Sequence, residues 1–143
     1  MILIDTNLLL YATIEDFAEH DRTRAWLTAQ FENVPKVGLP WHSVLGYVRL
    51  ASNRSAFKRG RPVSEAWQIA RRWLALDNVW IPQPTERHGR LINELIESSQ
   101  VTSRSVMDIH LAALAIEHGL TLCSADNGFA RYRNLRWLNP LED

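Results

Sequence analysis

Short apolar runs alternate with segments of helical periodicity along this chain of 143 residues. A short apolar run is typical of a strand buried on both faces, and apolar residues three and four apart indicate a helix packed on one face. Strands that alternate with helices build a mostly parallel sheet covered on both sides. The sequence therefore predicts an α/β fold in one domain spanning 1–143. The predicted strands are 1–4, 35–40, 79–82, 120–123 and 135–138, and the predicted helices are 8–12, 20–32, 41–51, 64–76, 85–98, 105–118 and 126–132.

Local signals indicate where two of these helices begin and end. Ser64 has a side chain typical of an N-cap and is expected to open helix 64–76. Gly119 directly follows helix 105–118, and glycine accepts the left-handed conformation that often ends a helix. Segment 53–62 combines polar residues with a glycine and a proline, so we expect a loop there.

The composition is that of a globular chain, with 46% hydrophobic and 22% charged residues. The single cysteine, Cys123, permits no intramolecular disulfide and lies in an apolar run, so we expect a buried thiol rather than a nucleophile. The segment that begins with Met1 has no basic stretch, and no apolar run approaches the roughly 18 residues of a membrane helix. We therefore expect a cytoplasmic protein that does not bind membranes.

The charge of the chain is balanced, with 16 basic and 16 acidic residues. A protein held to nucleic acid by its overall charge is usually basic. Any surface that binds phosphate must therefore be a local patch. Most of the basic residues are arginines, which suit phosphate recognition but are equally explained by a GC-rich genome.

Three aspartates stand where the predicted topology brings chain segments together. Asp5 follows the first predicted strand, Asp126 follows strand 120–123, and Asp108 opens the helix that leads into that strand. Ligands of open parallel sheets bind outside the carboxyl ends of the strands, so the three carboxylates meet at one edge if the two strands are neighbours. Converging carboxylates repel one another unless a cation lies between them, and an all-oxygen ligand set suits Mg²⁺ or Mn²⁺.

Each of these aspartates also has a purely structural explanation. All three lie near predicted helix starts, where a carboxylate caps backbone N–H groups. Ser105 and Asp108 stand three residues apart before an apolar run, which is close to a capping box, and Asp126 is placed to cap the helix that contains Phe129. Capping alone does not require buried strands to deliver the acids. The strand context therefore favours a shared site, although no single aspartate is diagnostic.

Several segments resemble the motifs of PIN-domain nucleases. Ile4-Asp5-Thr6-Asn7 is similar to the opening motif of this family, and Ser124-Ala125-Asp126-Asn127-Gly128-Phe129 is similar to its last motif. Segment 108–119, DIHLAALAIEHG, resembles the third motif, in which an aspartate begins a helix of small residues. Segments 38–43 and 135–141 are similar to VapC-type toxins, the PIN-domain ribonucleases of bacterial toxin–antitoxin pairs. The resemblance covers almost the whole chain and depends on the order and spacing of the motifs.

This resemblance implies a PIN-like three-layer α/β/α sandwich and a metal-dependent endoribonuclease that hydrolyses RNA phosphodiester bonds. Asp5, Asp108 and Asp126 are the implied catalytic residues, which bind Mg²⁺ or Mn²⁺ directly or through water and so activate a water molecule. Asn7 and Ser124 are candidates for supporting these acids or contacting phosphate. The resemblance also implies a cognate VapB-type antitoxin and a homodimer.

One departure from the family pattern concerns an acid. PIN domains usually carry a glutamate on the helix after the second strand, and Gly46 stands at that position when 43–49 is aligned with this helix. A glycine inside a helix costs about 1 kcal/mol relative to alanine, which indicates a steric reason such as close helix packing or room for substrate. The chain is then either an active nuclease with three aspartates, which we favour, or a non-catalytic PIN fold that binds RNA or protein. His42 is either a compensating polar group or only a histidine at a helix start.

Segment 49–61 is the most basic stretch, with five basic residues and no acid. Clustered positive charge attracts RNA in a salt-dependent way. A solvated loop and a docking site for an acidic antitoxin tail are the alternatives. The candidate RNA contacts are Arg49, Arg54, Lys58, Arg59 and Arg61.

The predicted helices carry more aromatic surface than a small core requires, and the excess suits a dimer face or a groove for an antitoxin helix. The residues concerned are Trp26, Trp41, Trp67 and Trp73.

Two other enzyme classes fit poorly. A haloacid-dehalogenase-like phosphatase needs a second aspartate where this chain has Asn7. A dinucleotide-binding domain needs a Gly-x-Gly-x-x-Gly motif after the first strand, and the sequence has none.

Overall fold

The computed structural model describes residues 1–57 and 60–142. These residues build a five-stranded parallel sheet in the order β3-β2-β1-β4-β5. The central strand β1 pairs with β2 on one side and with β4 on the other, so the two strands that precede Asp5 and Asp126 are neighbours. The strands are β1 Ile2–Ile4, β2 Val37–Gly38, β3 Val79–Trp80, β4 Thr121–Cys123 and β5 Trp137–Leu138.

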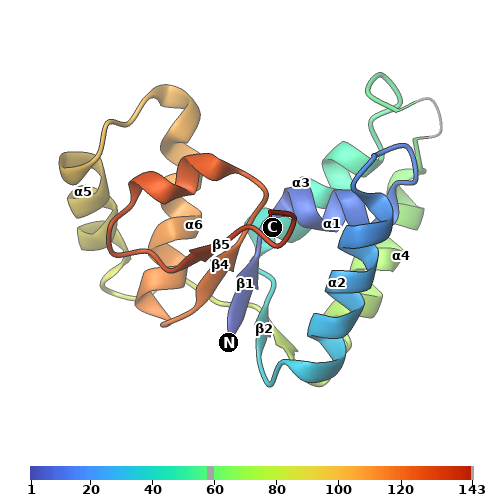
Figure 1. Cartoon of the computed structure of the whole chain (residues 1–143), viewed down its shortest axis with the longest axis horizontal. Helices are drawn as coiled ribbons and strands as arrows, with labels where there is room; N and C mark the ends of the chain where they lie inside the picture. Colours follow the sequence, from blue (N-terminus) through green and yellow to red (C-terminus); the bar gives the residue numbers. More distant parts are fainter. Residues whose placement is uncertain (58–59, 143) are drawn as a thin grey trace.

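Helices cover both faces of this sheet (Figure 1). On one side α1 packs against α2 and α3, and α3 packs against α4, whereas α5 and α6 pack together on the other side. The predicted three-layer α/β/α sandwich is thereby confirmed. The α-helices are α1 Thr6–Thr13, α2 His20–Asn33, α3 Trp41–Ala51, α4 Val63–Leu74, α5 His88–Ser98 and α6 Val106–Glu117, and the 3₁₀ helices are η1 Ser103–Ser105 and η2 Asn127–Arg131.

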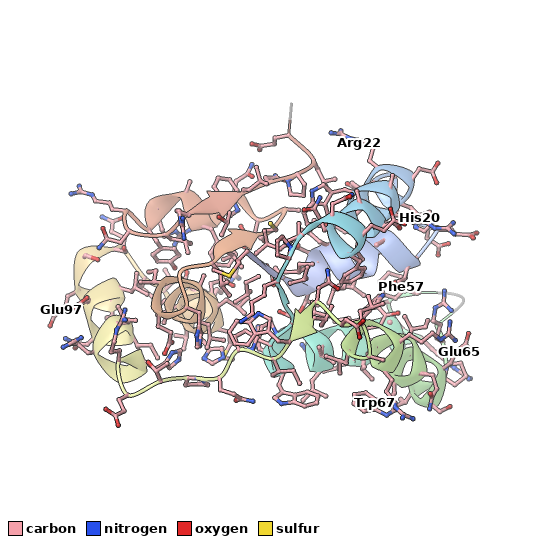
Figure 2. All side chains as sticks on the ribbon, turned by 90° about the horizontal axis from the view of Figure 1, so that it is seen from below. His20, Arg22, Phe57, Glu65, Trp67 and Glu97 are labelled. Carbon is pink, nitrogen blue, oxygen red and sulfur yellow. The ribbon has the colours of Figure 1, made fainter. Side chains whose placement is uncertain are left out.

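Two hydrophobic clusters lie on the two faces of the sheet. Strand β1 contributes to both because successive side chains of a strand point to opposite faces: Ile4 belongs to the cluster with α1–α4, and Leu3 to the cluster with α5 and α6. Figure 2 shows Glu97 of α5 at one end of the molecule and Trp67 of α4 toward the other. The central strand, which Asp5 directly follows, is therefore held from both sides.

The start of α4 differs from the sequence prediction. The helix begins at Val63 with Pro62 as its N-cap residue, so Ser64 lies in the first turn and does not cap it. Proline has a fixed φ and no N–H group, and both properties suit a helix start. The predicted end of α6 is confirmed, because Gly119 lies just beyond the helix with a φ of 66°, a left-handed conformation that glycine adopts readily.

Two exclusions made from the sequence can be compared with the structure. Within the described residues, no helix has the length and apolar character needed to cross a membrane. Cys123 is buried in β4, and burial raises the pKa of its thiol to about 12. This cysteine is therefore a core residue and not a nucleophile at neutral pH.

Candidate active site at the ends of β1 and β4

Asp5 directly follows the central strand and forms the floor of the candidate site. Its backbone N–H donates to the carbonyl of Cys123 on β4 at 3.0 Å. Its carboxylate caps α1 by accepting the N–H of Thr6 at 2.7 Å, and it also accepts the hydroxyl of Ser124 at 2.7 Å. The residue is 9% exposed. The strand ladder and the helix start together fix this carboxylate in place.

A hydrogen-bond network connects Asp5 to the segment after β4. The Oγ of Ser124 accepts the side-chain amide of Asn7 at 3.2 Å and the backbone N–H of Asp126 at 3.0 Å. The Oδ1 of Asn7 accepts the backbone N–H of Ala125 at 3.3 Å. The structure thus brings Asn7 and Ser124 between two of the aspartates, and a phosphate contact by either residue stays a prediction.

Asp126 lies at the exposed rim of the site. It is the N-cap of η2, and its Oδ1 accepts the backbone N–H of Gly128 at 2.8 Å. The capping role that the sequence suggested for this aspartate is therefore confirmed, as it is for Asp5. Capping and metal binding are compatible, because a carboxylate has two oxygens and several lone pairs.

Asp108 is half-buried in the first turn of α6 and differs from the other two acids. No hydrogen bond joins its carboxylate to another part of the chain that the structure describes, and Ser105 makes no side-chain cap bond either. The predicted capping box is thus wrong, because α6 continues directly from η1 and Ser105 has helical backbone angles. The pKa of Asp108 is raised to about 6, mainly by burial and then by the negative charges of Asp126 and Asp5.

The donor set can be compared with what a metal ion requires. Across 1–57 and 60–142, no three His, Cys, Asp or Glu side chains are grouped closely enough to hold a metal ion directly. The aspartates still act on one another: burial is the main cause of the raised pKa of Asp5, and the charge of Asp126 adds to it. A cation relieves such repulsion, and Mg²⁺ commonly keeps several of its waters. The three carboxylates therefore suit a hydrated divalent ion.

Gly46 packs against the residue that follows Asp5. A Cβ at this position would lie 2.7 Å from the Oγ1 of Thr6, a distance that forces one of the two groups to move. The same Thr6 hydroxyl donates to the carbonyl of Ser43 at 3.1 Å. Close packing of α3 against the start of α1 is therefore the steric reason for this glycine.

No sequence pattern pointed to Arg131, which connects two parts of the site. From η2, its guanidinium donates to the carbonyl of Gly128 at 2.9 Å and to the hydroxyl of Ser105 at 3.3 Å. It thereby ties the segment after Asp126 to the start of α6. Its positive charge also opposes the rise in the pKa of Asp108.

The basic stretch is only partly free to contact RNA. Arg49 on α3 and Arg54 in the following loop are exposed. Arg61 instead donates to a backbone carbonyl of α1 and pairs with a glutamate on α4, both at 3.1 Å. Lys58 and Arg59 lie outside the described residues.

A line of polar side chains begins at the buried carboxylate of Glu117, near the end of α6. Glu117 accepts the backbone N–H of Thr85 at 2.6 Å and pairs with the Nδ1 of His88. Burial acts to raise the pKa of Glu117, but these hydrogen bonds outweigh it and hold the pKa below its usual value. The Nε2 of His88 lies 3.0 Å from the Nδ1 of His110, whose ring meets that of His42 with centroids 5.8 Å apart. Burial, followed by the neighbouring His88 and His42, lowers the pKa of His110.

The fold and the three aspartates beside the ends of β1 and β4 together define a class of protein. A family model for the PIN domain matches residues 2–135, a range that contains β1, β4 and all three aspartates. The chain belongs to the PIN domain family.

Curated relatives place the chain more narrowly. Ribonuclease VapC43 of Mycobacterium tuberculosis is 35% identical over 142 residues, which cover 99% of this chain and 97% of the relative. Ribonuclease VapC33 of the same organism is 32% identical over 143 residues, the full length of both chains. Within the PIN domain family, the chain groups with these VapC ribonucleases.

Solved structures agree with this fold. VapBC2 from Rickettsia felis, bound to a DNA fragment from its promoter, matches with a TM-score of 0.63 and 20% identity over 97% of this chain and 98% of the other. FitAB bound to the IR36 DNA fragment matches with a TM-score of 0.67 and 19% identity over 100% and 99% of the two chains. At these identities the likeness concerns the fold alone.

Proposed function

We propose that this chain is a metal-dependent endoribonuclease, the toxin of a toxin–antitoxin pair, with a catalytic site formed by Asp5, Asp108 and Asp126. The observation that carries this proposal is the environment of Asp108. Its carboxylate has no hydrogen-bond partner among the described residues, and its pKa is about 6 because of burial and the charges of the other two aspartates. A strongly shifted carboxylate without a structural partner is typical of a functional position.

Each aspartate contributes differently to the proposed site. Asp5 is the fixed acid, because the Thr6 N–H and the Ser124 hydroxyl orient its two oxygens. Asp126 lies at the exposed rim, and Asp108 is delivered by α6. Together they would hold Mg²⁺ or Mn²⁺, partly through water, and the bound ion would activate a water molecule and stabilise charge on the phosphate.

The proposed substrate is RNA, and the reaction is hydrolysis of a phosphodiester bond. Support comes from the similarity to proteins named as ribonucleases over essentially the full chain. The exposed Arg49 and Arg54 offer positive charge for the RNA backbone. Ser124 and Asn7 keep the loop that carries Asp126 against Asp5.

A second candidate function is a PIN fold that binds RNA or protein without cutting. Gly46 favours it, because Thr6 occupies the space that a side chain at this position would need. If this position is the one that carries a glutamate in other PIN domains, the site has one acid fewer.

We also propose that a VapB-type antitoxin neutralises the toxin, and that the chain forms a homodimer in the cytoplasm. The similarity to VapBC2 and FitAB supports the first point. Exposed apolar side chains support a protein interface: they include Trp41 and Leu45 on α3 and Val106 and Met107 at the start of α6.

The decisive experiment is RNA cleavage by the purified chain. Structured RNA should be cut with Mg²⁺ or Mn²⁺ and remain intact in EDTA. Asp5→Asn, Asp108→Asn and Asp126→Asn should each abolish cleavage without changing the circular dichroism spectrum, because asparagine keeps a side-chain oxygen that can cap a helix. Asp21→Asn, on the exposed face of α2, is the matched control and should cut like wild type.

Two results would contradict the proposed activity. Cleavage that survives EDTA excludes the metal mechanism, and cleavage that survives the aspartate substitutions excludes this site. RNA binding without cleavage under any divalent ion would instead support the second candidate function.

A further inference from the structure

The line of side chains from Glu117 to His42 joins three helices that are far apart in the sequence. His42 lies in the first turn of α3, His88 begins α5, and His110 and Glu117 lie on α6. His110 and Glu117 are two helical turns apart, so they share one face of α6, and His88 bridges the gap between them.

The direction of hydrogen bonding along this line is set at the Glu117 end. The N–H of Thr85 donates to Oε1 of Glu117, so Oε2 faces the Nδ1 of His88. A carboxylate only accepts, so the Nδ1 of His88 carries a proton. In the neutral state of both rings, the Nε2 of His88 is then an acceptor, and His110 donates to it from its Nδ1 at 3.0 Å and keeps an unprotonated Nε2. In that state one carboxylate determines the tautomer of both histidines.

The other end of the line lies beside the acidic site. The Thr6 hydroxyl bonds to the carbonyl of Ser43, so the residue after Asp5 contacts the residue after His42. His42 is also one of the groups that lower the pKa of Asp5, after the hydrogen bonds from Ser124 and Thr6. The turn of α3 that carries His42 therefore packs against the start of α1, next to the floor of the site.

The outward side of His42 is open. It lines a shallow hollow of about 340 Å³ on α3 together with Trp41, Leu45, Gly46 and Arg49. The hollow is therefore lined by one imidazole and one guanidinium from the same helix. Both groups are N–H donors that suit phosphate oxygens.

A purely stabilising role explains the buried part of this line poorly. The Glu117 side chain is fully buried and that of His88 is 12% exposed. Burying such groups costs free energy, and well-packed apolar residues often stabilise a protein at least as well. A role at the site explains why hydrogen bonds join Glu117, His88 and His110, whose ring in turn contacts His42 on α3.

We propose that His42 contacts the sugar–phosphate backbone of RNA at this site, and that Glu117, His88 and His110 are positioning residues that hold its ring in place. This inference rests on the proposed nuclease function and assigns to it a substrate contact. His42 donates a ring N–H to a phosphate oxygen next to the scissile bond. The His110 ring packs against His42 edge to face and limits its rotation.

RNA binding in EDTA tests the contact separately from cleavage. The probe is a short single-stranded RNA labelled with fluorescein, and the readout is fluorescence anisotropy. His42→Ala should weaken binding about fivefold to tenfold, the loss of one hydrogen bond to phosphate. The control is His118→Gln, because His118 neighbours Glu117 but bonds instead to the carbonyl of Gln83 at 2.7 Å. This control should bind RNA like wild type.

Glu117→Gln tests the positioning role. The N–H of Thr85 keeps the amide oxygen in the place of Oε1, so the new NH₂ group faces His88 and donates where the carboxylate accepted. His88 and His110 should then both change tautomer, which ¹⁵N NMR of the imidazole rings reports directly. Binding of the RNA probe should weaken by less than in His42→Ala, and Glu117→Gln should add nothing in the His42→Ala background.

Each outcome decides between the two proposals. If wild type cleaves RNA and His42→Ala binds the probe equally well, the inference is wrong and the nuclease proposal stands. If wild type cleaves nothing but binds the probe through His42, the contact stands and the nuclease proposal fails. An additive loss from Glu117→Gln in the His42→Ala background, or a change of oligomeric state in His42→Ala, would show that these residues act elsewhere and would overturn the inference.

Discussion

Asp5 and Asp126 contrast with Asp108 in how the fold holds them. The first two cap a helix and accept hydrogen bonds from the backbone, and the Ser124 hydroxyl connects their segments. Asp108 has neither a cap role nor a hydrogen-bond partner among the described residues. Burial and the charges of Asp126 and Asp5 raise its pKa to about 6.

This difference shows how structural and functional demands are divided in the site. An aspartate that caps a helix stabilises the fold, so its presence alone says little about function. An aspartate that is half-buried, repelled by its neighbours and unpartnered destabilises the fold, so another demand must keep it there. The clearest sign of function is thus the residue that contributes least to folding.

The largest expected effect separates activity from stability at Asp108. Asp108→Ala should reduce RNA cleavage by about a hundredfold or more, as expected when one charge is removed from a catalytic centre. The free energy of unfolding in urea should fall by no more than about 0.5 kcal/mol. A large loss of stability would instead show that Asp108 is a structural residue, like the two aspartates that cap helices.

Asp5 should behave in the opposite way when it is truncated. Asp5→Ala leaves the N–H of Thr6 and the hydroxyl of Ser124 without their acceptor, so stability should fall by about 1–2 kcal/mol. Asp5→Asn should recover most of this stability but no cleavage. Urea unfolding and RNA cleavage of the two variants check the result, and equal stabilities would mean that the cap is dispensable.

The close contact between Gly46 and Thr6 offers a test of how rigidly the structure around Asp5 is packed. Gly46→Ala should destabilise the protein by about 1 kcal/mol, because overpacking costs about 1–3 kcal/mol and replacing a helical glycine returns about 1 kcal/mol. Adding Thr6→Ala removes the clashing hydroxyl and should restore the stability that Gly46→Ala loses. A double-mutant cycle in urea measures the coupling, and additive effects would show that the two residues do not touch.

The smallest effect is the dependence of stability on pH. The pKa of Asp108 rises from 3.8 to about 6 on folding, so the folded state keeps a proton that the unfolded state loses. Wild type should therefore lose stability relative to Asp108→Asn as the pH rises from about 4 to about 6, and the difference in stability between the two proteins should stay constant above that range. This difference should be modest, because a half-exposed group is screened by solvent. Thermal unfolding at a series of pH values measures the difference, and Mn²⁺ should reduce it by binding to and stabilising wild type.

Much of the fold could be predicted because its signals are local. The apolar runs at 1–4 and 120–123 are both buried strands, and the 3.6-residue spacing marks the helices well. Even the two-residue strand β2 was indicated by an apolar stretch between two prolines. The error at Ser64 arose because two residues that both suit a helix start stand two positions apart, and only the structure shows that Pro62 is the N-cap residue.

The acids of the candidate site could be predicted because they follow buried strands or open the helix that leads into one. Asp5 and Asp126 could be placed because parallel topology brings the ends of β1 and β4 together. The contact between His88 and Glu117 depends on how α5 packs on α6, and no periodicity reports that. The steric reason for Gly46 was equally hidden, since Thr6 lies on another helix and is distant in sequence.

The position of β1 between two hydrophobic clusters has a consequence for local opening. Leu3 and Ile4 anchor the strand to opposite layers, and the N–H of Asp5 is bonded across to Cys123 on β4. That amide should exchange with solvent deuterium only when the whole domain unfolds, whereas amides of the exposed segment around Asp126 should exchange through smaller fluctuations. The floor of the site is thus as durable as the fold itself, and local fluctuations of the rim leave it in place.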